Sequence, residues 1–207
     1  MKKQKTQLQM KKKRMNLNEA YWASRYREDK TGWDLNRISP PLKEFIDQLE
    51  DKTLKILIPG AGNAYEAEYL VSKGFEDVHV LDIAKEPLQN LRLRVPFFPE
   101  ANLHNIDFFK FQDTFDLILE QTFFCALPRE QRNLYARKMN SLLKNNGKLV
   151  GLFFNIEFEK EGPPFGGNKE EYLTYFSPEF NIELLENCRN SIPPRQGNEL
   201  FFIFKKN

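Results

Sequence analysis

Apolar side chains in the middle of the chain first form a short continuous run and then recur at helical spacing. The run Leu54 to Pro59 is typical of a buried strand, and a loop containing glycine follows it. Beyond the loop, Ala67, Leu70 and Val71 stand at i, i+3 and i+4 positions, the spacing of one helix face. The pattern predicts a strand, a tight loop and a helix.

Punctuating residues predict where this helix begins and ends. Asn63 with Glu66 three positions later forms a capping-box pattern. Gly74 stands where the helix would end. We therefore expect a helix that starts directly after the glycine loop.

The same alternation of apolar runs and helical spacing continues to the end of the chain. Further strands are predicted at Val78 to Leu81, Leu103 to Ile106, Phe115 to Leu119, Lys148 to Phe154, Phe180 to Leu185 and Leu200 to Phe204. Further helices are predicted at Glu86 to Leu93, Arg129 to Leu143 (stopped by Asn145-Asn146-Gly147) and Lys169 to Phe176. This order predicts an α/β fold with a mostly parallel seven-stranded sheet and helices on both faces.

Length and charge limit the possible organisation and partners. A chain of 207 residues, 41% of them apolar, is long enough for one well-buried domain. Seven of its 31 basic residues lie within the first 14 positions, which leaves 24 basic against 29 acidic residues. We expect a basic disordered tail over residues 1–15 and a single domain over 16–207. The acidic body argues against a nucleic-acid partner.

The positions of cysteine, histidine and apolar residues bear on the location of the protein and on whether it contains a metal or a disulfide. Its longest apolar run, Leu149 to Phe154, is far too short to cross a bilayer, so we expect no membrane association and a cytoplasmic location. The two cysteines, Cys125 and Cys188, and the two histidines stand singly, which predicts no metal and no structural disulfide. Cys125 could be a nucleophile, but a buried small hydrophobe is favoured because no histidine is near it in sequence.

Gly60, Gly62 and Asp82 together point to a nucleotide-derived ligand. Asp82 lies 20 positions after Gly62, where a βαβ nucleotide-binding unit places the carboxylate that binds ribose hydroxyls. Tyr65 occupies the position of the third glycine of a dinucleotide fingerprint and would block a pyrophosphate. The remaining candidate is S-adenosylmethionine. The alternative is that the glycines form only a tight turn and that Asp82 is only a solvated strand end.

Aromatic residues supply candidates for the rest of a pocket. Trp22 and Tyr26 are four positions apart, on one helix face, and their rings would attract a sulfonium cation by about 0.5 to 2 kcal/mol. The competing interpretation is that this face packs on the core. Trp33 follows the Gly32 break and is less easily explained by helix packing. Phe123 and Phe124 could form the wall of an apolar acceptor pocket.

Seven separated stretches, in order, resemble the thiopurine S-methyltransferase family. They are "YWASRYREDKTGWD", "ILIPGAGNAYEAEYL", "VLDIA", "NIDFF", "LILEQTFFCALPREQRNLY", "GPPF" and "SIPPRQGNE". Within the family they are most similar to the branch of plant thiol and halide methyltransferases. The resemblance implies a Rossmann-like class I methyltransferase that uses S-adenosylmethionine, with residues 16–50 as an N-terminal helical lid.

The resemblance also implies roles for individual residues. The implied cofactor-binding residues are Trp22, Tyr26 and Trp33 at the methionine and sulfonium end, Gly60 and Gly62 in the loop, Asp82 on ribose, Asp107 and Phe108 beside adenine, and Gln121 near the methionine end. Arg195 aligns with a family arginine placed near the acceptor pocket, beside Trp33, Phe123 and Phe124. Tyr26 and Gln121 depart from the usual family residues, which leaves the acceptor open.

The chemistry of the sequence favours a simple displacement reaction. Methyl transfer to a polarisable anion requires alignment in a dry pocket and no acid/base pair. The sequence contains no evident pair of this kind and lacks the (D/N)-P-P-Y stretch of enzymes that methylate amino nitrogens of bases. We expect a monomer acting on a small thiol, hydrosulfide or halide. The alternatives are an O- or N-methyltransferase of a small metabolite, a non-catalytic protein that binds S-adenosylmethionine, and, disfavoured by Tyr65, a nicotinamide-dependent oxidoreductase.

Overall fold

The computed structural model describes residues 15–160 and 162–206, so the predicted tail lies almost wholly outside the described residues. The helices are α1 (Glu19–Arg27), α2 (Pro40–Asp47), α3 (Tyr65–Ser72), α4 (Lys85–Arg94), α5 (Arg132–Ser141) and α6 (Lys169–Phe176). The strands are β1 (Ile56–Pro59), β2 (Val78–Asp82), β3 (Leu103–Asn105), β4 (Phe115–Gln121), β5 (Leu143–Phe154), β6 (Phe180–Asn187) and β7 (Glu199–Lys206). Short 3-10 turns lie at Glu100–Asn102, Phe124–Ala126, Arg129–Gln131 and Pro193–Arg195. None of these helices is long and apolar enough to cross a membrane.

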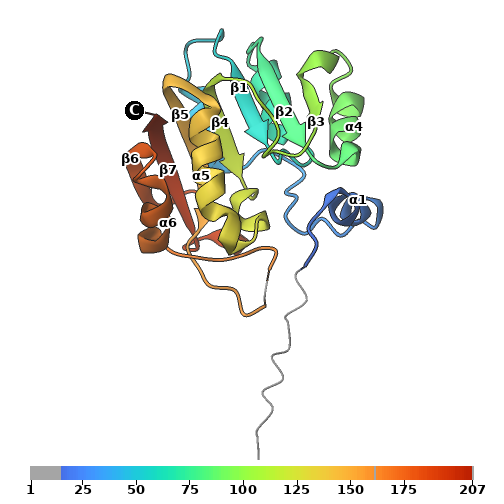
Figure 1. The fold of residues 1–207 in the computed structure, drawn as a ribbon. Helices are drawn as coiled ribbons and strands as arrows, with labels where there is room; N and C mark the ends of the chain where they lie inside the picture. Colours follow the sequence, from blue (N-terminus) through green and yellow to red (C-terminus); the bar gives the residue numbers. More distant parts are fainter. Residues whose placement is uncertain (1–14, 161, 207) are drawn as a thin grey trace, which may run out of the picture.

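The seven strands form one sheet, as predicted, in the order β3-β2-β1-β4-β5-β7-β6 (Figure 1). Strands β1 to β5 pair in parallel, with Ile56 opposite Val78 and Leu117 opposite Lys148. Strand β7 runs antiparallel between β5 and β6. Since β1 to β5 run in one direction, their carboxyl ends meet at one edge of the sheet, where ligands bind in open α/β sheets.

Each central strand is buried on both faces because helices cover both. In β1, Leu57 belongs to one hydrophobic cluster with residues of α5 and α6, including Tyr135 and Phe176. Its neighbours Ile56 and Ile58 belong to a second cluster with residues of α2, α3 and α4. Successive side chains of a strand point to opposite faces, so one short apolar run supplies both clusters. The prediction of helices on both faces is confirmed.

The predicted helix Arg129 to Leu143 is shorter in the structure. Residues Arg129–Gln131 form a 3-10 turn, and the α-helix runs from Arg132 to Ser141. Leu143 instead begins β5 and pairs with Phe115, although the next pair in the register is Leu117 with Lys148. The stretch Asn145-Asn146-Gly147 is thus an irregularity inside a strand, with Asn146 at φ +64°, and it does not terminate a helix.

The capping box predicted from Asn63 and Glu66 is wrong. Helix α3 does begin at Tyr65, but its N-cap is Ala64, at φ +54° and ψ +46°, and no side chain caps it. The Asn63 side chain is engaged elsewhere: its amide nitrogen donates to Asp34, and its oxygen accepts from Asn90 Nδ2 at 2.9 Å. Tertiary contacts therefore replace the local cap, and they tie the loop before α3 to the N-terminal segment.

Candidate active site

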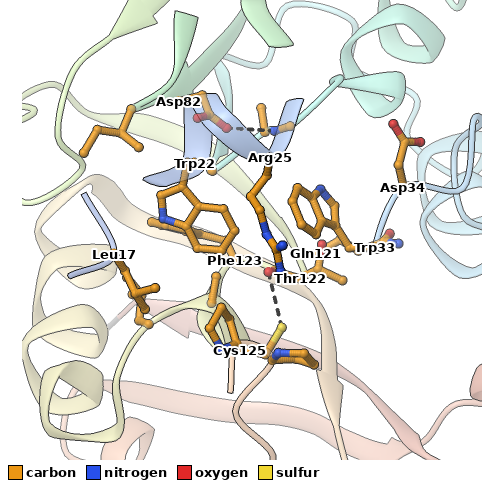
Figure 2. A pocket seen from close by; sticks show the side chains of 18 of the residues that line it. Leu17, Trp22, Arg25, Trp33, Asp34, Asp82, Gln121, Thr122, Phe123 and Cys125 are labelled. Carbon is orange, nitrogen blue, oxygen red and sulfur yellow. Dashed lines mark hydrogen bonds between the residues drawn. The ribbon is translucent and has the colours of Figure 1, made fainter. Parts of the chain in front are cut away.

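A cavity of about 830 Å³ opens at the carboxyl edge of the sheet, beneath the segment that contains α1 (Figure 2). This volume lies in the range of small-molecule sites. All of the residues predicted to bind the cofactor line it: Trp22, Tyr26, Trp33, Gly60, Gly62, Asp82, Asp107, Phe108 and Gln121. Three of the four residues predicted for the acceptor pocket line it as well: Trp33, Phe123 and Arg195.

The loop after β1 requires its two glycines. Gly60 and Gly62 both have positive φ, +56° and +53°, a backbone conformation that residues other than glycine rarely adopt. A Cβ at Gly60 would lie 2.3 Å from the ring of Phe123, so the loop backbone packs directly against an aromatic wall. The nitrogen of Gly62 donates to Asp82 Oδ2 at 3.0 Å, which joins the loop to the end of β2.

The Asp82 carboxylate accepts hydrogen bonds from the backbone and can accept further ones from a ligand. Its Oδ1 accepts from the nitrogen of Ala84 at 2.8 Å, so each carboxylate oxygen holds one backbone amide. A carboxylate has about four acceptor positions, so about two remain, enough for the two hydroxyls of a ribose. Asp82 is 7% exposed, and burial raises its pKa to about 6 against the lowering effect of the backbone amides. The site thus fits the adenosine part of S-adenosylmethionine.

Three aromatic rings from the N-terminal segment form a compact group beside the loop. The rings of Trp22 and Tyr26, both on α1, lie 5.6 Å and 5.8 Å from the ring of Trp33, edge to face in each case. Burial and the charge of Asp82 raise the pKa of the Tyr26 phenol, so it stays neutral at physiological pH. These rings offer π-faces of the kind that attract a sulfonium cation.

Asp107 and Phe108 follow β3 at the next strand end. The Asp107 Oδ1 atom accepts from the nitrogen of Phe109 at 2.9 Å, which holds the short turn in place. Phe108 is 4% exposed and packs edge to face on Phe123, with ring centroids 5.1 Å apart. Because Phe108 also contacts Tyr135 in the core, it joins the cavity wall to the packing beneath the sheet.

Two contacts fasten the N-terminal segment over the cavity. Ser39 Oγ donates to Gln121 Oε1 at 2.5 Å, so the Gln121 side chain is bound to the segment that precedes α2. Arg195 Nη2 donates to the carbonyl oxygen of Trp33 at 2.9 Å. The Nη1 atom of Arg195 lies 3.4 Å from Glu199 Oε1, which balances its charge. Trp33 is therefore held by its backbone, with its ring in the cavity wall.

The loop after β4 separates the two phenylalanines that were predicted together. Phe123 lines the cavity, but Phe124 is 1% exposed and lies in the core against Phe153 and Tyr172. Phe124 is thus a core residue and not a wall of the pocket, because the 3-10 turn that it begins directs it inward. Cys125 is buried, its thiol donates to the carbonyl of Thr122, and burial raises its pKa, which agrees with a packing role.

Glu120, which the sequence places at a predicted strand end without a structural role, fixes this loop. It is fully buried, and its Oε1 accepts from the nitrogens of Phe123 and Phe124 at 2.9 and 3.1 Å. Its Oε2 accepts a hydrogen bond from the hydroxyl of Tyr135. Burial raises the pKa of Glu120 to about 7. The only sequence signal was a glutamate at the end of an apolar strand.

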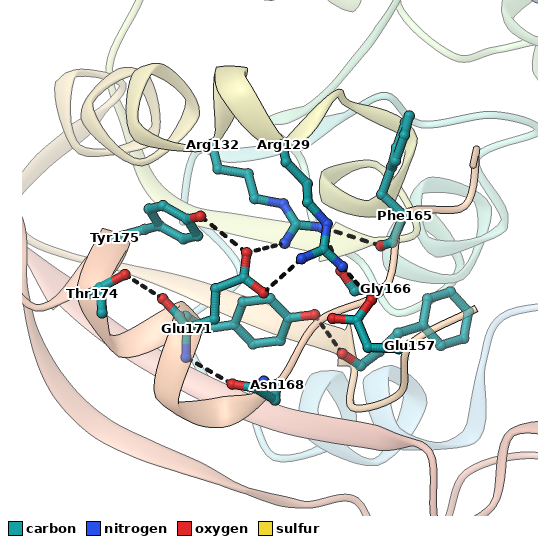
Figure 3. A network of polar contacts seen from close by, with 11 residues as sticks. Arg129, Arg132, Glu157, Phe165, Gly166, Asn168, Glu171, Thr174 and Tyr175 are labelled. Atoms are coloured by element: carbon teal, nitrogen blue, oxygen red, sulfur yellow. Dashed lines mark hydrogen bonds and ion pairs between the residues drawn. The ribbon is translucent and has the colours of Figure 1, made fainter. Parts of the chain in front are cut away.

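A second polar network holds the segment that follows β5 (Figure 3). Arg132 is fully buried and donates to Glu171 Oε1 at 2.8 Å and to the carbonyl of Gly166 at 2.8 Å. Arg129 donates to Glu157 and to the same carbonyl. The network thus joins α5, α6 and residues 157–160 and 162–167, and Phe158, Pro163 and Pro164 among these residues line the cavity.

Gly60→Ala should lower the free energy of unfolding by about 2 to 3 kcal/mol, since a positive φ costs about 1 to 2 kcal/mol and Phe123 must also move. Gly74→Ala is the matched control, because Gly74 also has positive φ, +83°, but has open space around it. Urea unfolding of both variants measures the difference. Equal losses would mean that the contact between Gly60 and Phe123 does not constrain the loop.

The fold and the site define the class of protein. Solved structures with the same fold include a 1,6-didemethyltoxoflavin-N1-methyltransferase of Burkholderia thailandensis with S-adenosylhomocysteine bound, at a TM-score of 0.70 and 14% identity over 91% of this chain and 87% of that one. A TehB-like SAM-dependent methyltransferase of Corynebacterium glutamicum aligns at a TM-score of 0.63 and 21% identity, over 91% and 98%. The chain therefore has the fold of the class I S-adenosylmethionine-dependent methyltransferases.

The family follows from the sequence comparisons. The profile of the thiopurine S-methyltransferase family matches residues 17–205, so the chain belongs to this family. It is 30% identical to "Probable thiol methyltransferase 2" of Arabidopsis thaliana, over 89% of this chain and 84% of that protein. It is 29% identical to thiocyanate methyltransferase 1 of the same plant, over 92% and 86%. The chain is therefore an enzyme that uses S-adenosylmethionine.

Proposed function

We propose that this enzyme transfers the methyl group of S-adenosylmethionine to a small thiol, hydrosulfide or halide anion by direct displacement. The observation that carries the proposal is the joining, in one cavity, of the glycine loop, Asp82 and the aromatic group of Trp22, Tyr26 and Trp33. The names of the plant relatives, which include a thiol and a thiocyanate methyltransferase, support the same class of acceptor.

The cavity residues divide into a donor side and an acceptor side. On the donor side, Asp82 would accept from the ribose hydroxyls, Asp107 and Phe108 would bind the adenine, and Gly60 and Gly62 would let the ligand approach the backbone. Gln121 and the three rings of the aromatic group would surround the methionine and sulfonium end. On the acceptor side, Trp33, Phe123 and Arg195 would enclose the nucleophile, while Phe124 supports the loop from the core.

The reaction needs an acceptor that arrives already charged. S-adenosylmethionine supplies, when bound, an electrophilic methyl group on a sulfonium sulfur. Among the described residues, no histidine lines the cavity. The pKa of Tyr26 and that of Cys125 are both raised by burial, so neither group is an activated base. What the chain contributes is alignment and exclusion of water, which favour attack by a polarisable anion.

The remaining parts of the proposal concern the setting of the enzyme. Residues 16–50 would act as a lid over the cavity within a single domain 16–207, because Ser39 and Trp33 fasten this segment to the rest of the site. The enzyme would act as a monomer, because residues of one chain line the whole cavity. It would work in the cytoplasm on a small molecule, and not on nucleic acid or at a membrane.

The pH dependence should report the acceptor. With a thiol as acceptor, kcat/KM should rise with pH along the ionisation of that thiol, typically at about pH 8 to 9 for a free thiol. With iodide, which is already an anion, kcat/KM should stay nearly constant between pH 7 and pH 9. The two profiles are measured on one preparation with labelled S-adenosylmethionine.

Measuring both acceptors together removes effects of enzyme stability, since these would appear in both profiles. A common ionisation in the thiol and iodide profiles above pH 7 would mean that a protein group takes part, against the proposal. Turnover of amines or hydroxyl compounds, with none of any thiol or halide, would replace the proposed acceptor class with an O- or N-methyltransferase activity. Binding of S-adenosylmethionine without turnover of any acceptor would contradict the proposed reaction.

A further inference from the structure

Most charged side chains that line the cavity have a partner within the protein. Asp82 and Asp107 accept from backbone amides, and Asp34 accepts from Asn63. Among the cations, Lys30 lies 2.6 Å from Glu28, and Arg195 is bound to Glu199 and to the carbonyl of Trp33. Each of these groups therefore already has an ion-pair or hydrogen-bond partner within the protein.

Arg25 is the exception on the inner wall. It projects from α1 and lines the cavity, and its side chain forms neither a hydrogen bond nor an ion pair within residues 15–160 and 162–206. Its Nε atom is buried without an acceptor. Arg37, the other cation on the lining without a recorded partner, is exposed to solvent. Among the described residues, Arg25 is thus the partly buried cation of the cavity wall whose guanidinium has no hydrogen-bonded or ion-paired acceptor.

The direction of the Arg25 side chain places this charge on the acceptor side. In Figure 2 it runs between the rings of Trp22 and Trp33, away from Asp82, and its guanidinium points toward Thr122. Thr122 belongs to the loop that also carries Phe123, so the cation faces the wall assigned to the acceptor and not the ribose site. On its other side, the Arg25 Cζ lies 5.5 Å from the centre of the Tyr21 ring.

A buried N–H group without an acceptor is costly, and a guanidinium carries five donors in a fixed planar arrangement. An anion in front of Arg25 would satisfy these donors and balance its charge. The Tyr21 ring, 5.5 Å from the Arg25 Cζ, helps to hold the guanidinium in place, which lowers the conformational entropy lost when the anion binds.

We propose that Arg25 binds the negatively charged acceptor and selects anions, such as a halide, thiocyanate or a thiolate, over neutral molecules. This deepens the proposed function and rests on it, because it names the residue that recognises the charge of the nucleophile. Arg25 is a specificity-determining residue in this role: it lowers the free energy of the bound anion and takes no proton.

The test is equilibrium binding of thiocyanate to the enzyme saturated with S-adenosylhomocysteine, measured by calorimetry. Arg25→Gln should raise the Kd of thiocyanate by about 10- to 100-fold, the range expected for hydrogen bonds to a charged group. Arg25→Lys should restore part of the affinity, because it keeps the charge without the planar donors. The KM for iodide should follow the same order among the three proteins.

Two measurements keep this result interpretable. The Kd of S-adenosylhomocysteine should change by no more than about twofold in Arg25→Gln, which also reports that the variant is folded. Lys85→Gln is the matched control for loss of one positive charge, since Lys85 is exposed and lies outside the cavity lining. Its affinity for thiocyanate should equal that of the parent.

Three outcomes would overturn the assignment. One is equal affinity of Arg25→Gln and the parent for thiocyanate. A second is weaker binding of S-adenosylhomocysteine with unchanged binding of thiocyanate, which would assign Arg25 to the carboxylate of the donor. The third is an equal loss of thiocyanate affinity in Lys85→Gln, which would mean that the anion responds to the net charge of the protein and not to Arg25. Failure of the proposed function is separate: the parent would then turn over no thiol or halide, whatever the thiocyanate titrations show.

Discussion

S-adenosylhomocysteine should bind this enzyme about tenfold more weakly at pH 5 than at pH 7, because ribose hydroxyls donate to the ionised form of Asp82. Burial raises the pKa of this carboxyl to about 6, so most of it is protonated at pH 5 and most is ionised at pH 7. Binding favours the ionised form, so affinity increases as the pH rises through this pKa. Calorimetry at several pH values measures the curve.

Substitution of Asp82 should remove this pH dependence. Asp82→Asn should bind S-adenosylhomocysteine about 10- to 100-fold more weakly at pH 7, the loss expected when charged hydrogen bonds to the ribose are removed. It should also unfold at a lower temperature, because the amides of Gly62 and Ala84 lose a charged acceptor. Calorimetry is therefore done well below the unfolding temperature of the variant.

Glu66→Gln is the matched control for this titration. Glu66 is also buried, burial raises its pKa to about 7, and it lines the cavity, so its titration is the main competing source of a pH effect. The control should keep the parent's pH dependence. A curve that persists in Asp82→Asn and disappears in Glu66→Gln would show that the wrong carboxyl had been assigned to the ligand.

Arg132→Met should lower the free energy of unfolding by about 3 to 5 kcal/mol, the cost expected when one partner of a buried ion pair is removed. Arg132 is 0% exposed, and its loss removes the buried cation from Glu171 and the buried donor from the carbonyls of Phe165 and Gly166, while Glu171 keeps a neutral donor in the Tyr175 hydroxyl at 3.0 Å. Arg129, which is 42% exposed, is then the remaining cation near Glu171. Unfolding in urea measures the loss.

Two further variants separate the ion pair from the volume of the side chain. Arg137→Met changes the same helix at a position that is 72% exposed, where the ion pair with Glu179 is long at 3.5 Å, so little change is expected. The double variant Arg132→Met/Glu171→Gln should recover part of the loss, because the unpaired charge is gone. If Arg132→Met costs no more than Arg137→Met, the network in Figure 3 does not stabilise the fold.

The strands could be predicted because their signal is local. A parallel strand covered on both faces is a continuous apolar run, and Ile56, Leu57 and Ile58 feed both clusters of the core. The start of α3 was also predicted, although for the wrong reason. The partners of Asn63 are Asp34 and Asn90, 29 and 27 positions away, and such contacts leave no trace in a local pattern.

The site could be predicted only as far as strand ends determine it. Gly60 follows β1, Asp82 ends β2 and Asp107 follows β3, so a correct order of strands brings them together. The sequence could not distinguish Phe123 from Phe124, because adjacent residues at the start of a 3-10 turn point in different directions. Here one side chain points into the cavity and the other into the core. Arg25 was missed, and Glu120 was noted only as a strand-end residue, since the role of each depends on which groups lie opposite it in space.

The hydrogen bond from Arg195 to the carbonyl of Trp33 joins residues 162 positions apart. A chain emerging from the ribosome completes its N-terminal parts first. The hydrogen bond that holds the Trp33 carbonyl can therefore form only after Arg195, between β6 and β7, has been synthesised. Nascent chains that end before residue 195 should accordingly lack this contact and bind the ligand more weakly than chains that extend beyond β7.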